Sequence, residues 1–148
     1  MSASTVRGFV AAKVATLPSV RHVYSAVPAT GVNPIPFEYV DSGPHALVVR
    51  GNTTRQYGTG NQWVTRAVDV EFRFSGLEPG AAERLIDTLE GEILTVFSAG
   101  ITQGGAVIDL LYSGSDKPYE ELDRADRSWY VWVAHFEARE RYAIEMTA

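Results

Sequence analysis

Several features are missing from this chain, and each absence narrows its function. Without cysteine it can form no disulfide framework, thiolate nucleophile or cysteine-based zinc site. No apolar run approaches the roughly 20 residues of a membrane-spanning helix, and residues 1–5 lack the basic and apolar regions of a signal peptide. We therefore expect a soluble, unsecreted protein without membrane contacts.

Basic residues are also fewer than acidic residues. The chain has 13 Lys and Arg against 18 Asp and Glu, a formal net charge of −5. A dedicated nucleic-acid-binding domain usually presents a clustered basic face, so this balance argues against one. The length of 148 residues and the 45% hydrophobic content are typical of one globular domain, here residues 1–148. A chain of this length can bury a core without disulfide or metal cross-links.

Two segments have the apolar spacing of helices. Residues 5–17 repeat apolar side chains every three or four positions, and Pro18 ends that pattern. The second helix starts at Glu78-Pro79 and has an apolar stripe through residues 81–97, with Gly100 as its stop.

Strands are predicted over residues 20–26, 36–40, 46–50, 64–74, 107–112 and 128–144, with a turn at residues 41–44. The alternation is cleanest in residues 64–74, which indicates one face on the core and one toward water or a partner. In the last strand, residues 129–134 are apolar on both faces and residues 137–141 are charged.

Two long polar segments interrupt this pattern. Residues 51–62 hold no aliphatic side chain and are predicted to form an exposed hairpin loop, whereas residues 113–127 form an acidic excursion. The element order contains neither repeats nor an alternating βαβ series. It predicts an α+β fold, with a mainly antiparallel or mixed sheet and both helices packed on one face.

No group of residues in the sequence has the spacing of a catalytic, metal-binding or phosphate-binding motif. His22, His45 and His135 fall on separate predicted elements without metal-ligand spacing, and the acids of residues 116–126 lack a calcium-loop pattern. The glycine-rich pieces are not phosphate loops, and Ser113-Gly114-Ser115 is not a nucleophile elbow. We predict no catalytic, cofactor-binding or metal site.

The aromatic residues are assigned mainly to the core. Trp129, Tyr130 and Trp132 alternate with valines, a pattern that favours packing over a stacking platform for bases or sugars. Trp63 stands where the polar segment enters the long strand. Its ring is expected to anchor that segment within the subunit, with an anchor against another chain as the alternative.

The order of elements resembles the tail terminator, or tail completion, proteins of long-tailed bacteriophages. The resemblance runs from the helix at residues 5–17 and the strand at residues 20–24 through the long strand 64–74, the helix 81–97 and the closing strand 129–141. It rests on size, order and pattern, not on a diagnostic motif.

This resemblance implies a structural protein of the virion tail or neck, assembled in the host cytoplasm and without enzyme activity. It implies a homo-oligomeric ring, commonly a hexamer, that caps the tail tube protein, ends its growth and meets the head-tail connector or stopper protein. DNA would pass through the lumen without specific binding. The expected interface residues are Arg50, Arg55, Tyr57, Trp63, Asp116, Glu120, Glu121, Asp123, Arg124, Arg139 and Arg141.

Two alternatives stay open. A tail tube or head-tail stopper protein would use similar sheets and polar loops, but a tube protein forms filaments rather than closed rings. A small-molecule-binding or catalytic α+β domain would have a concave pocket under residues 51–62, with convergent polar groups and perturbed titrations.

Overall fold

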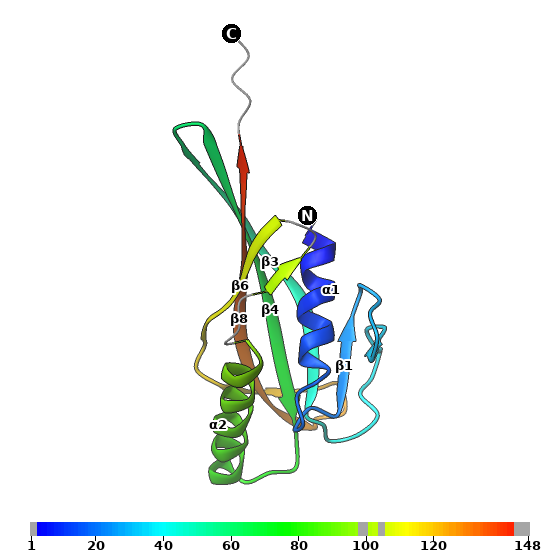
Figure 1. Ribbon diagram of the computed structural model, residues 1–148. Helices are drawn as coiled ribbons and strands as arrows, with labels where there is room; N and C mark the ends of the chain where they lie inside the picture. The colour runs from blue at the N-terminus through cyan, green and yellow to red at the C-terminus, as the bar shows by residue number, and fades with distance from the viewer. Residues whose placement is uncertain (1–2, 98–100, 104–105, 144–148) are drawn as a thin grey trace.

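The computed structural model describes residues 3–97, 101–103 and 106–143 (Figure 1). In chain order its elements are α1 (Ala3–Val14), β1 (His22–Ser25), β2 (Val32–Asn33), β3 (His45–Gly58), β4 (Asn61–Phe74), α2 (Pro79–Val96), β5 (Ile101–Gln103), β6 (Ala106–Ser115), β7 (Tyr119–Leu122) and β8 (Ser128–Ala143). The predicted α+β class is confirmed.

The described strands form one mixed sheet in the order β2-β1-β3-β4-β8-β6-β5, and β7 pairs with β8 as well. The long strands β3, β4 and β8 pair antiparallel at its centre, while β1 runs parallel to both β2 and β3. Strands β6 and β7 occupy different stretches of the same edge of β8. Both helices lie on one face of this sheet, as predicted (Figure 1).

The core lies between that face and the helices. Alternate residues of β4 and β8 point into it, and the ring of Phe72 stacks on Trp132 with centroids 5.4 Å apart. Helix α2 presents Ile86, Leu89 and Ile93, whose spacing puts them on one side of the helix. Neither described helix is long and apolar enough to span a membrane.

A smaller aromatic cluster covers part of the opposite face. His45 of β3 is fully buried there, stacked against Tyr39 at 4.8 Å and tilted against Trp129 at 5.8 Å. The segment 34–44 holds Tyr39 over the sheet, and the Asp41 side chain accepts a hydrogen bond from the Gly43 amide. The helix-free face is therefore open only beyond this cluster.

The strand predicted at residues 36–40 does not form. Pro34 and Pro36 lack the amide hydrogens of a sheet ladder, and Phe37 and Val40 are 84% and 77% exposed. A two-residue strand forms earlier instead, at β2. The β-like composition of residues 36–40 reflects the half-buried ring of Tyr39, which stacks on His45, rather than pairing.

Residues 51–62 are not a loop but the two paired ends of β3 and β4. Their pairing runs from Thr53 opposite Arg66 to Gly58 opposite Asn61, and only Thr59-Gly60 forms the turn. Gly60 has a φ of +72°, which favours glycine. The segment is polar because both of its faces are exposed. Polar composition alone does not distinguish a paired hairpin from an irregular loop.

The prediction of an acidic excursion at residues 113–127 is also partly wrong. It contains the end of β6 and all of β7, whose four side chains are exposed. The first helix ends at Val14, three residues before the predicted end. The closing strand starts at Ser128 as predicted, whereas its predicted end at residue 144 and the helix stop at residue 100 lie outside the described residues.

Candidate functional site

A ribbon formed by the hairpin ends of β3 and β4, residues 51–62, extends beyond the helix-covered part of the sheet, and the end of β8 pairs with its β4 strand (Figure 1). Residues 52–60 are exposed on both faces, and Tyr57 near its tip is 65% exposed. From Arg50 to Val68 the chain includes Arg55 and Arg66 and no acid. The ribbon therefore carries one positive charge, that of Arg55, and an exposed aromatic ring, and two further arginines, Arg50 and Arg66, lie at its base.

The structure brings further predicted interface residues to the same end of the molecule. Trp63 of β4 lies opposite Arg141 of β8, and Thr65 lies opposite Arg139. Trp63 is 43% exposed, so part of its ring is available to another chain, and its role as an anchor stays a prediction. Arg139 lies 3.6 Å from Glu137 on its own strand.

The acidic residues, by contrast, largely serve their own chain. Asp116 contacts His135 at 3.0 Å, and Glu121 accepts a 2.8 Å hydrogen bond from Arg73. Asp123 accepts a hydrogen bond from the Trp129 indole at 2.9 Å, together with two backbone amides of its own turn. These bonds, led by that of the indole, lower the pKa of Asp123.

The remaining members of the predicted acidic surface are more available. The Arg124 guanidinium lies over the ring of Phe37, 5.2 Å from its centroid, on the surface of the molecule. Glu120 makes no ion pair with the described residues, and its side chain is exposed. We therefore retain Glu120 as the acid of this segment best placed to meet another chain.

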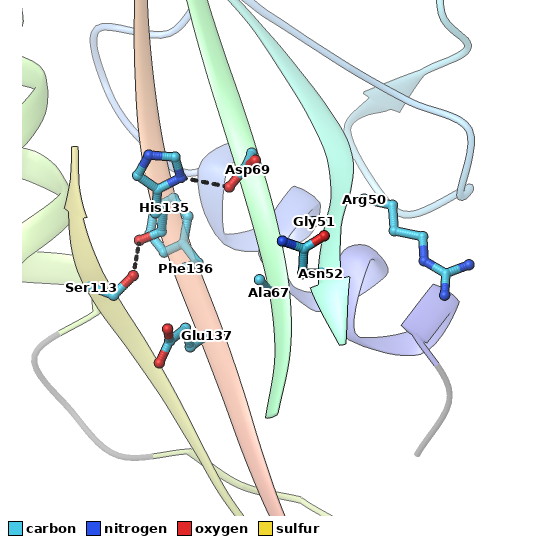
Figure 2. Close-up of a pocket in the computed structure, with 9 residues that line it drawn as sticks. All are labelled: Arg50, Gly51, Asn52, Ala67, Asp69, Ser113, His135, Phe136 and Glu137. Carbon is cyan, nitrogen blue, oxygen red and sulfur yellow. Dashed lines mark hydrogen bonds and ion pairs between the residues drawn. The ribbon is translucent and has the colours of Figure 1, made fainter. Parts of the chain in front are cut away.

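A polar pocket of about 480 Å³ opens at the base of the ribbon (Figure 2). It arises where β3 shifts register against β4 between Arg50 and Thr53. A side chain at Gly51 would bring its Cβ within 2.9 Å of the Ala67 carbonyl oxygen, so the close approach of the strands requires glycine. Its lining residues are Arg50, Gly51, Asn52, Ala67, Asp69, Ser113, His135, Phe136 and Glu137.

His135 at the wall of this pocket is held between two carboxylates. Its Nδ1 lies 2.6 Å from Asp69 and its Nε2 lies 3.0 Å from Asp116. These two hydrogen bonds, that to Asp69 first, raise the pKa of His135 above its ordinary value of 6.5. The imidazole ring thereby links β4 and β8 to the segment that follows β6.

This arrangement meets part of what the small-molecule alternative predicts, but it lacks a reactive pair. Both ring nitrogens of His135 face carboxylates, so neither is directed at a nucleophile. The Ser113 hydroxyl donates to the His135 backbone carbonyl at 3.1 Å rather than to the ring (Figure 2). The geometry favours an electrostatic clamp over acid–base catalysis.

Sequence reasoning missed this clamp for a specific reason. Asp69 and His135 are 66 positions apart and become neighbours only through the register of β4 and β8. The alternation of residues 64–74 places Asp69 on the outward face, but it says nothing about which strand lies beside it. Within the described residues, no group of three or more His, Asp or Glu is arranged to hold a metal ion.

Comparison with known proteins identifies a fold likeness only. No protein-family model matches the sequence, and no curated protein matches it. A chain of the "Virion of native gene transfer agent (GTA) particle" is similar in structure, with a TM-score of 0.44 and 15% identity over 94% of this chain and 92% of that chain. A likeness at this level does not carry function from one chain to the other.

Proposed function

We propose that this chain is a non-enzymatic structural protein of a phage-like virion, which assembles into a closed ring of about six copies. The ring caps the tail tube, ends its polymerisation and joins it to the head-tail connector or stopper protein. Its place is the tail or neck, assembled in the host cytoplasm, with DNA passing through the lumen without specific contacts. The projecting ribbon is the observation that carries this proposal.

The ribbon supports a role in assembly because it forms a regular hairpin although none of its side chains packs in the core of its own chain. None of the side chains of residues 51–62 is buried, and the segment adds an exposed Tyr57 and Arg55 to the surface. Tyrosine, tryptophan and arginine are the residue types that carry most binding energy at protein interfaces. A projection of this composition fits a contact with another subunit better than a pocket for a ligand.

The runner-up is a tail tube or head-tail stopper protein. The observation in its favour is the same ribbon, because a head-to-tail contact gives a ring if the rotation closes and a filament if it does not.

Electron microscopy and mass measurement of the purified protein, alone and with tail tube protein, test the proposal. We expect closed rings of uniform mass that bind one end of tube filaments and stop their growth. Long filaments of the protein alone would support the tube alternative. A protein that stays monomeric at high concentration, both alone and with tube protein, would overturn the ring.

A further inference from the structure

We propose that successive copies join by sheet extension, in which the free edge of β3 in the ribbon of one copy pairs with the free edge of β7 in the next. This inference rests on the proposed self-assembly and names its contact. The occupant of each edge is a second copy of the same chain.

Both edges are open within the described part of the chain. Strand β1 covers β3 only from His45 to Val48, and no described strand pairs with that side of β3 from Val49 to Gly58. Strand β7 pairs only with β8, so its outer side is also free of described partners. Free edges present unpaired amide and carbonyl groups, which are a template for a strand of another chain.

One copy cannot satisfy its own edges. Strands β3 and β7 stand on opposite sides of the central pair β4 and β8, and the ribbon and β7 lie at opposite ends of the long strands. The free β3 edge therefore reaches a β7 edge only in another molecule. Such a contact is head-to-tail, the kind that generates a ring or a filament.

The direction of pairing follows from the sheet. Each of the pairs β3–β4, β4–β8 and β8–β7 is antiparallel, so β3 and β7 run in opposite directions. When a second copy extends the sheet with its helices on the same face, its β3 is therefore antiparallel to β7 of the first. The helix faces of both copies then lie on one side.

Charge selects the register. Arg55 shares the helix-covered face of the sheet with Val64, which lies opposite it, and Glu120 shares that face with Tyr130. Both side chains are exposed, and neither makes an ion pair with the described residues. Antiparallel pairing with Arg55 beside Glu120 neutralises both charges and places Gln56 opposite Tyr119 on the other face.

Charge reversal tests this register. We expect Arg55→Glu and Glu120→Arg each to weaken self-association at least about tenfold, and the double variant to recover most of it. Arg84→Glu, on the exposed side of α2, is the matched control and should assemble normally. Unimpaired assembly of both single variants, or a double variant no better than either, would overturn the proposal.

Site-specific cross-linking locates the edge directly, and the cysteine-free chain makes it clean. A short bismaleimide should link Gln56→Cys/Tyr119→Cys molecules into chains longer than dimers. The control Gln56→Cys/Glu83→Cys should stay largely uncross-linked, because it places only one cysteine at the proposed contact. Absence of such chains in assembled protein, or linkage of residue 56 only to tube protein, would overturn the β3–β7 contact.

The outcomes separate this contact from the proposed function. Closed rings that assemble regardless of the charge reversals and do not cross-link would leave the ring standing and remove the β3–β7 contact. Cross-linked open filaments would support the contact and overturn the closed ring. A strict monomer would overturn both.

Discussion

Two histidines near the helix-free face have opposite pKa shifts. Burial lowers the pKa of His45, whose Nε2 lies 2.8 Å from the Asp41 carbonyl oxygen. The hydrogen bonds to Asp69 and Asp116 raise that of His135. As pH falls below 6.5, His45 binds a proton more readily in the unfolded state than in the folded state. As pH rises above 6.5, His135 loses its proton more readily in the unfolded state than in the folded state. Both effects reduce stability away from pH 6.5.

The His135 effect gives a prediction on the alkaline side. The stabilisation from its clamp is complete below pH 6.5 and disappears as pH rises through the raised pKa. We expect His135→Gln to remove this loss and to cost about 1 kcal/mol at pH 6, since the clamp is partly exposed to solvent. Denaturant unfolding from pH 6 to pH 9 measures it. An unchanged pH slope in the variant would show that the clamp contributes nothing.

Asp123 provides a second prediction at this scale. Replacement by alanine leaves the Trp129 indole and two turn amides without their acceptor. We expect Asp123→Ala to lower the midpoint of thermal unfolding by several degrees, whereas Glu120→Ala leaves it nearly unchanged. Equal midpoints for the two variants would contradict the assignment of Asp123 to the fold.

At the scale of elements, the ribbon departs from the core through the register shift of β3. Gly51 sits in this shift, with Ala67 of β4 close against it, while nothing lies within 4 Å of a Cβ built at Gly58. The first glycine is therefore required by packing and the second is not.

This contrast gives a matched pair of substitutions. Gly51→Ala should destabilise the fold by roughly 1–3 kcal/mol, because backbone atoms of Ala67 must move to admit the new methyl group. Gly58→Ala should change stability by less than about 0.5 kcal/mol. Denaturant unfolding compares them, and a neutral Gly51→Ala would mean that the strands separate without cost.

For the whole molecule, folding and assembly reside in different parts of the chain. The buried side chains lie between the sheet and its helices, with a second cluster around His45, whereas the ribbon projects beyond both. A change confined to the outer part of the ribbon, beyond the packed Gly51, should therefore alter assembly without altering stability. The single-domain assignment of residues 1–148 remains a proposal.

Shortening the ribbon tests this division. Replacing residues 56–63 by Asn-Gly joins the facing positions Arg55 and Val64 through a two-residue turn and removes no buried side chain. We expect the free energy of unfolding to change by no more than about 1 kcal/mol, while ring formation is lost. Calorimetry and electron microscopy on the same preparation measure both. Normal rings from this variant would exclude the ribbon from assembly.

Local pattern was enough for much of the fold. The alternation in residues 64–74 identified β4, the apolar stripe identified α2, and the start of β8 at Ser128 followed from its aromatic run. The same reasoning failed for residues 51–62 and 119–122, where strands exist without a buried face. Periodicity detects a strand only when one side of it is apolar.

The sequence by itself determined most apolar side chains of the main core, the α+β class and the charge of each segment, because these follow from composition and from spacing along the chain. Only the tertiary structure decided that Asp69, His135 and Asp116 meet and that Glu121 and Asp123 are bound within the chain. It also decided that no described strand covers the outer edges of β7 and of the ribbon part of β3. Those outcomes depend on strand register and order. Both are set by packing between segments that are far apart in the chain, and the local sequence pattern does not specify that packing.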